Sequence, residues 1–392
     1  MRTQSGARCA FLKTSSKTKG VIAMQHGSIW YDKKSRAFYG RWREDVWVNG
    51  EVKRKQRCVF LTKKDDRYRC KKDVAPLFAE KFAPVHQGKA DARSTMPLGD
   101  FVKDHYLPWA KQNLKPSTAY THANRWQAIA PYCEDVILRD FRTVDCAELL
   151  DKLCKRGWSR ATLHRVKSLF SAIFRYAKNI GVLDGLNPIQ DTMIPGNARP
   201  PAETCAYTLD EVRAMLSALP EPAKTIIACA AFTGFRKSEL QGLEWSDYDG
   251  DTLCVSRAIW QGKVGEPKTA KSRAAVPVIP QLRQMLDNSR GHRLQGPIFA
   301  GINGKPLRLD NLTARVIIPC LRVAGITWHG WHGLRRGLAT NLHQMGVDDK
   351  TTQAILRHSS IGLTQNTYIK AIPEASVTAM QKFSNVVQPL VN

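Results

Sequence analysis

Aromatic and polar positions alternate through residues 28–62, a pattern typical of strands that bury one face. The alternation is clearest over residues 28–31, 37–43 and 46–48, and residues 58–61 supply a further strand. Asn49-Gly50 is a strong signal for a two-residue hairpin turn. The pattern predicts a small antiparallel sheet near the N-terminus.

Residues 98–188 change to apolar positions spaced three and four apart, which predicts a compact helical domain. One helix starts after Pro116 and covers 117–130, and a second covers 144–153. A long amphipathic helix over 162–180 ends at Gly181.

The last part of the chain mixes helical and strand-like segments. Thr208-Leu-Asp-Glu211 is a capping-box pattern that opens a helix over 212–219, and Gly234 closes another helix. Further elements are expected over residues 252–259, 274–279 and 332–346, and residues 356–360 are expected to end a short helix. The predicted fold class is mainly α with small β-sheets (α+β).

Two interruptions divide the chain, a polar stretch at 86–95 and a stretch with three prolines at 194–202. We therefore expect four parts: a basic N-terminal module (1–96), a helical domain (97–190), a linker (191–206) and a mixed α/β domain with a C-terminal tail (207–392).

The charge indicates a polyanionic partner. The 392 residues include 60 Lys and Arg against 34 Asp and Glu, and residues 1–96 alone hold 23 against 9. Nucleic acid is the first candidate, because Lys and Arg contacts to phosphates release counterions. No apolar run approaches the ~18 residues of a membrane span, and the N-terminus lacks a signal-peptide core. We expect a cytoplasmic, nucleoid-associated protein. Its ten cysteines, without a C-x-x-C pair, indicate reduced thiols and no metal site.

Two sets of basic side chains are candidate DNA contacts. They are Lys53, Arg54, Lys55 and Arg57 beside the predicted sheet, and Lys115, Arg160, Arg165 and Lys167 in the helical domain. The alternative is that the aromatic residues only form the core of the sheet while the charges face solvent. The sequence leaves both interpretations open.

Two arginines, two histidines and a tyrosine in the last part of the chain form a set that suits phosphodiester chemistry. Arg236 and Glu239 lie three apart, His332 and Arg335 repeat that spacing, and His358 precedes Tyr368 by ten residues. Two guanidinium forks can bind the non-bridging oxygens of one phosphate, and a tyrosine can attack phosphorus to form a covalent ester. Lys268, between the two strand-like segments, can protonate the leaving 5′-oxygen. This scheme needs no metal ion and no cofactor.

The ordered motifs resemble those of the tyrosine recombinase (phage integrase) family. The resemblance is carried by Thr-Gly-Phe-Arg236-Lys-Ser-Glu, Pro-Lys268-Thr, His332-Gly-Leu-Arg335-Arg, Arg-His358-Ser-Ser and Tyr368. The order and approximate spacings match across residues 206–385, and the resemblance is looser over residues 98–190. It implies Tyr368 as nucleophile, Lys268 as general acid, Arg236 and Arg335 as phosphate clamps, His332 and His358 as phosphate ligands or proton carriers, and Glu239 as the residue that orients Arg236.

The same resemblance implies partners and an origin. The expected partners are double-stranded DNA attachment sites, three further copies in a tetramer, and accessory DNA-bending or directionality proteins. The expected source is a prophage or other mobile element of a bacterium. Residues 372–383 resemble the tail helix that docks on a neighbouring subunit, although this helix could instead fold back on its own subunit.

Two residues depart from the common motifs of the family. Arg357 stands where a glycine is frequent, and Gly337 where a small hydroxyl residue is frequent. Neither departure removes a reacting group, so an active enzyme is expected.

Three other functions fit parts of this pattern. A type IB-like topoisomerase would use the same chemistry without strand exchange, and a non-catalytic DNA-binding regulator would keep only the fold. A metal-dependent nuclease would be inhibited by EDTA. The separate helical domain and the complete set of reacting residues favour the recombinase.

Overall fold

The chain forms two compact units, residues 1–201 and 202–392. The computed structural model describes residues 27–48, 50–86, 91–201, 203–267, 273–358 and 362. The boundary between the units falls inside the linker expected over 191–206. Each unit has its own hydrophobic core, and each is described separately.

The first unit begins with the predicted antiparallel sheet. Its strands are β1 (Ser28–Asp32), β2 (Ala37–Val48) and β3 (Glu51–Lys63), in that order across the sheet. The expected hairpin is confirmed, since Val48 pairs with Glu51 and Gly50 has the positive φ of 85° that such a turn requires. A helix that the sequence pattern does not predict, α1 (Lys71–His86), follows the sheet.

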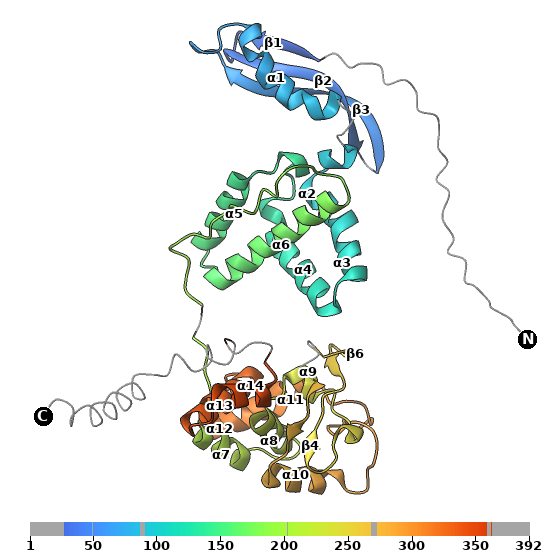
Figure 1. Cartoon of the computed structure of the whole chain (residues 1–392), viewed down its shortest axis with the longest axis vertical. Coiled ribbons are helices and arrows are strands. Elements are labelled where there is room, and N and C mark those ends of the chain that lie inside the picture. The colour runs from blue at the N-terminus through green and yellow to red at the C-terminus, as the bar shows by residue number, and fades with distance from the viewer. Residues whose placement is uncertain are drawn as a thin grey trace, which may run out of the picture. The chain divides into compact units, whose positions relative to one another are not determined.

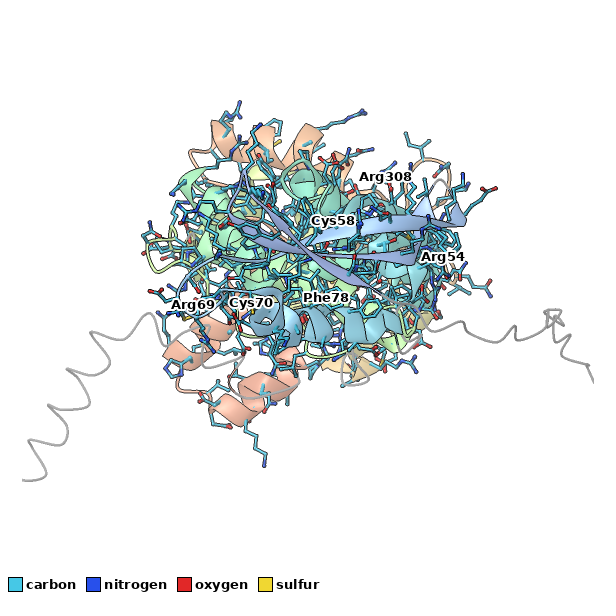
Figure 2. All side chains as sticks on the ribbon, turned by 90° about the horizontal axis from the view of Figure 1, so that it is seen from above. Arg54, Cys58, Arg69, Cys70, Phe78 and Arg308 are labelled. Atoms are coloured by element: carbon cyan, nitrogen blue, oxygen red, sulfur yellow. The ribbon has the colours of Figure 1, made fainter. Side chains whose placement is uncertain are left out.

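The sheet of the first unit has two different faces. Phe38 and Trp42 are buried on the face that α1 covers, where the Trp42 ring lies 5.9 Å from that of Phe78. Figure 2 labels Phe78 on α1, beside the strands. On the other face Tyr39 stands between Trp30 and Phe60, which are 39% and 48% exposed. The aromatic residues therefore supply a core and also an exposed row.

The predicted helical domain follows in the same unit. Its helices are α2 (Leu98–Phe101), α3 (Leu107–Asn113), α4 (Pro116–Ile129), α5 (Thr143–Lys155) and α6 (Arg160–Asn179). The helices α4, α5 and α6 confirm the segments expected from apolar spacing. Buried leucine and phenylalanine side chains of α5 and α6 form much of the core, including Leu150, Leu169 and Phe170.

Two proline residues widen the helices in which they lie. Residues Val102–Tyr106 form a π-helical turn between α2 and α3, just before Pro108. The same arrangement recurs in the second unit, where Thr313–Ile317 precedes Pro319. A proline has no N–H to donate and its ring collides with the carbonyl four residues earlier, so the preceding turn opens.

Part of the stretch expected as an exposed connector is packed instead. Ala198 is 7% exposed and belongs to the core of the helical domain. Arg199 accepts a hydrogen bond through its carbonyl from the N–H of Arg160. The proline-rich composition gave the wrong expectation for these residues, because prolines restrict the backbone without preventing side-chain burial.

The second unit surrounds one apolar helix, α8 (Figure 1). Its helices are α7 (Leu209–Ala218), α8 (Ala223–Thr233), α9 (Lys237–Leu240), α10 (Pro280–Arg290), α11 (Leu309–Leu312), α12 (Ile318–Val323), α13 (Trp331–Gln344) and α14 (Asp349–Leu356). Helices α7, α10 and α13 pack against α8, which is buried along most of its length. The predicted capping box is confirmed, since Thr208 and Glu211 bond each other at the start of α7.

The strands of the second unit differ from the two expected segments. The first segment is divided into β4 (Thr252–Leu253) and β5 (Ala258–Trp260), and the second shrinks to β7 (Val276–Pro277). Strand β7 pairs with β4, while β5 forms a hairpin with β6 (Lys263–Gly265). Across the described ranges, no helix combines the length and hydropathy needed to cross a bilayer.

Candidate active site

Arg236 and Glu239 lie at the start of α9, directly after the end of α8. Gly234 ends α8 with a φ of 63°, a backbone conformation that favours glycine. A Cβ at this position would also stand 2.7 Å from the Leu356 side chain, so two separate reasons favour glycine here. Arg236 precedes the four-residue helix rather than sharing a long helical face with Glu239. Its Nη1 donates to Glu239 Oε1 at 2.6 Å, and its backbone N–H donates to Oε2 at 3.0 Å.

Arg335 lies in α13 and is 6% exposed. Its Nη1 donates to the carbonyl of Gly234 and its Nη2 to the carbonyl of Leu356. These carbonyls belong to the ends of α8 and α14, where helices leave acceptors without intrahelical partners. The guanidinium of Arg335 is therefore held in a fixed plane between two helix ends.

Arg357 directly follows α14 and is 2% exposed. Its Nη2 donates to Glu239 Oε2 at 3.0 Å, and its guanidinium carbon lies 4.4 Å from the centre of the Phe235 ring. Its backbone has φ 56° and ψ 42°, the left-handed conformation that glycine adopts most easily. This geometry explains why glycine suits the position, and here an arginine occupies it with its guanidinium against Glu239 and Phe235.

The two histidines of the site have lowered pKa values. Burial, with the guanidinium groups of Arg335, Arg236 and Arg357, lowers the pKa of His358 to about 4. Loss of hydration and the same kind of neighbours also lower the pKa of His332, on the first turn of α13. Both rings are neutral at pH 7, so each can donate one hydrogen bond and accept another.

Positive charge is in excess at the site. Burial and the nearby cations of Arg236 and Arg357 lower the pKa of Arg335 to about 9, which still leaves it protonated at neutral pH. Glu239 is the carboxylate that bonds both Arg236 and Arg357. Three guanidinium groups around one carboxylate favour an anion such as a phosphate.

Gly337 lies where α13 meets the backbone of Tyr207. A Cβ at Gly337 would stand 2.5 Å from the Tyr207 carbonyl oxygen, which is closer than real Cβ contacts. The tyrosine also accepts a hydrogen bond from the His329 N–H through its hydroxyl. Gly337 therefore allows the backbone of α13 to approach the backbone of Tyr207 more closely than a residue with a side chain would.

The structure brings four of the six expected catalytic residues to one region, namely Arg236, His332, Arg335 and His358, together with Glu239. Lys268 and Tyr368 lie outside the described residues, as does the tail segment 372–383. Within the described part of the chain, no three His, Cys, Asp or Glu side chains are grouped as metal ligands.

The candidate DNA contacts of the sheet fall into two groups. Lys53 and Arg54 have side chains that are each 51% exposed, and Lys55 is also exposed. Arg57 instead donates to both carboxylate oxygens of Asp140, at 2.7 and 3.0 Å, and lies 3.4 Å from buried Glu44. Its charge joins the sheet to the helical domain.

The candidates of the helical domain divide in the same way. Lys115, Arg160 and Arg165 are exposed. Lys167 donates through Nζ to the carbonyls of Gln190 and Thr192, so it holds the segment after α6.

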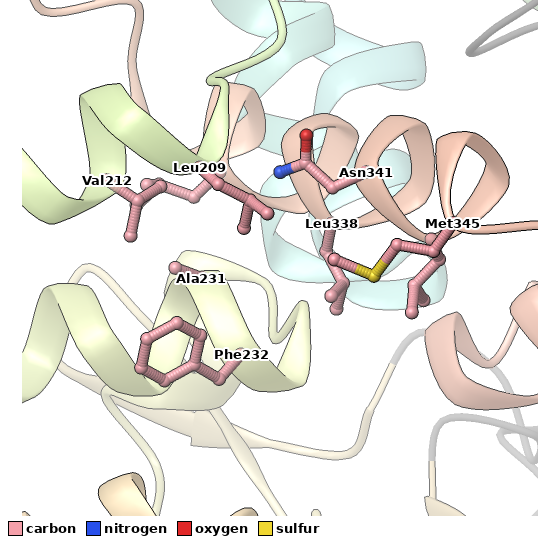
Figure 3. A pocket seen from close by; sticks show the side chains of 9 residues that line it. Leu209, Val212, Ala231, Phe232, Leu338, Asn341 and Met345 are labelled. Atoms are coloured by element: carbon pink, nitrogen blue, oxygen red, sulfur yellow. The ribbon is translucent and has the colours of Figure 1, made fainter.

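An apolar groove lies on the second unit, between α7, α8 and α13 (Figure 3). It is lined by Leu209, Val212, Ala231, Phe232, Leu334, Leu338, Asn341, Leu342 and Met345. Two of its residues are large and open to solvent, since Leu209 is 45% exposed and Met345 63%.

Comparisons with known proteins show the family to which the chain belongs. Residues 207–374 match the sequence profile of the Phage integrase family. A tyrosine recombinase XerC-like protein of Caldanaerobacter subterraneus subsp. tengcongensis is 24% identical over 83% of this chain and 92% of its own. Tyrosine recombinase XerC of Mycobacterium bovis BCG is 30% identical over 53% of this chain and 72% of its own.

Two solved structures share the fold. One is the Tn1549 transposon integrase in complex with transposon right end DNA, with a TM-score of 0.60, 19% identity, and coverage of 74% of this chain and 100% of that chain. The other is a lambda integrase tetramer bound to a Holliday junction, with a TM-score of 0.56, 18% identity, and coverage of 86% and 94%.

The relatives that match this chain are tyrosine recombinases. The chain belongs to the phage integrase family and is a tyrosine-type site-specific recombinase.

Proposed function

We propose that this recombinase cuts and rejoins DNA through a 3′-phosphotyrosyl intermediate, and that it integrates or excises a mobile element. The observation that carries the proposal is the cluster of Arg236, Arg335, His332 and His358, which holds excess positive charge at one place. The DNA complex of the Tn1549 integrase, which shares the fold, supports DNA as the substrate.

Each residue has a distinct role in the proposed cleavage. Arg236 and Arg335 bind the non-bridging oxygens of the scissile phosphate and stabilise its pentacoordinate transition state. Tyr368 attacks phosphorus, and its proton passes to a nearby base or water. The 5′-oxygen leaves with a proton from Lys268. Because the tyrosyl ester replaces the broken phosphodiester bond, the bond energy is kept and religation needs no ATP.

The neutral histidines complete the phosphate site in this proposal. Because their pKa values are lowered, His332 and His358 donate hydrogen bonds to phosphate oxygens without adding formal charge. Glu239 holds Arg236 in place by a bond to Nη1 and a bond to its backbone N–H.

The proposed assembly is a tetramer on two DNA duplexes, with accessory DNA-bending or directionality proteins at the attachment sites. The lambda integrase tetramer on a Holliday junction supports the four-subunit assembly on DNA. We assign the groove between α7, α8 and α13 to the tail segment 372–383 of a neighbouring subunit, because that segment carries Val377, Met380 and Phe383 three residues apart.

The test compares wild type with Tyr368→Phe on DNA from the source organism, denatured in detergent with EDTA present. Wild type should leave protein joined to 3′ ends at discrete sites, and the variant should bind DNA but leave none. Adducts scattered over all sequences would instead indicate a topoisomerase. Binding without any adduct, even on paired sites with partner proteins, would indicate a regulator and refute the proposal.

A further inference from the structure

Glu239 joins two arginines inside the second unit. Its Oε1 accepts from Arg236 Nη1 at 2.6 Å, and its Oε2 accepts from Arg357 Nη2 at 3.0 Å. The Glu239 side chain is 2% exposed and that of Arg357 is 0% exposed, while Arg236 reaches the surface at 21%. The inner arginine therefore holds the carboxylate that in turn holds the outer one.

The backbone of Arg357 makes its identity informative. A Cβ disfavours the left-handed conformation at φ 56°, and glycine would adopt it without strain. Strained backbone of this kind persists only where the surroundings fix it. The bond to Glu239 and the stacking on Phe235 supply that fixation. The turn alone would favour glycine, so the side chain must carry the reason for arginine.

We propose that Arg357 is a positioning residue for the phosphate clamp, which fixes the direction of the Arg236 guanidinium through Glu239. This inference rests on the proposed cleavage of DNA by the same site. Arg357 does not touch the phosphate, because its side chain is fully buried behind the carboxylate.

The charges around Glu239 support this arrangement. Burial raises the pKa of Glu239, but Arg357 and Arg236 outweigh it and hold the pKa below its usual value. The charge of Glu239 also acts on His332 and Arg335, where it favours the protonated form of each side chain. Without Arg357, the buried carboxylate keeps its desolvation and loses its strongest cation, so it binds a proton at higher pH and releases Arg236.

The test measures single-turnover cleavage of a nicked oligonucleotide that traps the covalent complex, with Arg357→Gly and Arg357→Lys. The glycine variant keeps the turn and removes the guanidinium. Its DNA affinity should stay within about twofold of wild type while its cleavage rate falls about 10- to 100-fold, as expected for a small misplacement of a catalytic group. The acid limb of its pH–rate profile should move to higher pH. Arg357→Lys should recover part of the rate.

Arg36 supplies a matched control, because it is another arginine in the left-handed region, with φ 51°, but on an exposed turn of the first unit. Arg36→Gly should cleave at the wild-type rate. Wild-type cleavage and an unmoved acid limb in Arg357→Gly would overturn the proposal.

A measurement without DNA separates this inference from the proposed function. In a double-variant cycle of Arg357→Gly and Glu239→Gln, the combined loss of Tm should be smaller than the sum of the single losses, because both variants break the same contact. Additive losses would refute the contact. A wild-type protein that forms no covalent complex would refute the proposed function, and the cycle would still decide whether Arg357 and Glu239 are coupled.

Discussion

Arg335 donates from inside α13 to the last carbonyls of two other helices, α8 and α14. Arg236 instead donates to the Glu239 carboxylate at the start of α9, and its side chain is 21% exposed. The two arginines assigned to one phosphate therefore have different partners: backbone carbonyls for Arg335 and a carboxylate for Arg236.

Replacing each arginine by alanine should show the contribution of each side chain to cleavage, and that of Arg335 to stability. Both Arg236→Ala and Arg335→Ala should slow DNA cleavage by about 10²–10³, the usual cost of one preorganised donor in a transition state. Arg335→Ala should also lower the free energy of unfolding by about 1–3 kcal/mol, because two buried carbonyls lose a donor. Single-turnover cleavage and chemical denaturation measure the two effects. Unchanged stability in Arg335→Ala would contradict the hydrogen bonds described for Arg335.

His358 should make stability depend on pH. Its folded pKa of about 4 lies below the ordinary value of 6.5, so the unfolded chain binds a proton more readily. The corresponding stability is fully present above pH 6.5 and is lost as the pH falls toward 4, by up to about 3 kcal/mol. Denaturation from pH 7.5 to 4.5 should therefore show a steeper loss in wild type than in His358→Gln. Parallel curves would place this ring in a solvated environment.

At the residue scale, the sequence identifies reactive groups better than the groups that hold them. The motif order predicts Arg236, His332, Arg335 and His358, because each type has chemistry that suits a phosphate. The part played by Arg357 depends on a left-handed turn and on a carboxylate 118 positions earlier in the chain. In the sequence, the one sign of this part is that Arg357 stands at a position where glycine is frequent.

Among the elements, the three-stranded sheet shows how charge and structure are combined. Glu44 in β2 is 3% exposed and bonds both Arg57 of β3 and Arg139 of the helical domain. Lys53 and Lys55, on the same strand as Arg57, are exposed, and Lys53 pairs with the exposed carboxylate of Glu51 at 3.4 Å. One strand thus carries two sets of cations, an ion-pair partner of the buried Glu44 and exposed lysines.

Substitutions in β3 should distinguish these sets. Lys53→Gln with Lys55→Gln should reduce the slope of log K against log salt for DNA binding by about 1–2, if both lysines contact phosphates. Arg57→Gln should leave the slope unchanged and lower the Tm, because it deprives Glu44 and Asp140 of a partner. An unchanged slope in the lysine variant would show that Lys53 and Lys55 do not contact phosphates.

Periodicity predicts those elements whose burial follows one face. It finds the three strands and the helices α4, α5 and α6, since their apolar residues repeat regularly. It misses α1, in which Pro76 and Pro84 interrupt the helical signal. It also merges β4 and β5, because the short pairings of the second unit depend on which distant segment lies beside them.

At the scale of the whole molecule, assembly depends on surfaces that a single chain leaves open. Met345, in the groove between α7, α8 and α13, is 63% exposed. An exposed apolar groove of this kind is typical of an interaction site.

Met345→Lys should disrupt assembly without disturbing the fold. Because the side chain is exposed, stability should change by no more than about 0.5 kcal/mol. Binding to a single DNA site should be retained, and formation of four-subunit complexes on paired sites should be lost, as native gels or light scattering would show. Val323→Lys, at a 91% exposed position outside the groove, is the control. Normal tetramers in Met345→Lys would exclude the groove as the seat of the tail.

The excess positive charge of the Arg236–Arg335–Arg357 cluster also has a consequence for the life of the protein in a cell. Mutual repulsion among these cations lowers the stability of the second unit, and a phosphate that binds only the folded form raises it. We therefore expect DNA-bound copies to unfold less often than unbound copies, and to be degraded more slowly by proteases. The abundance of the recombinase would in this way follow the number of sites available to it.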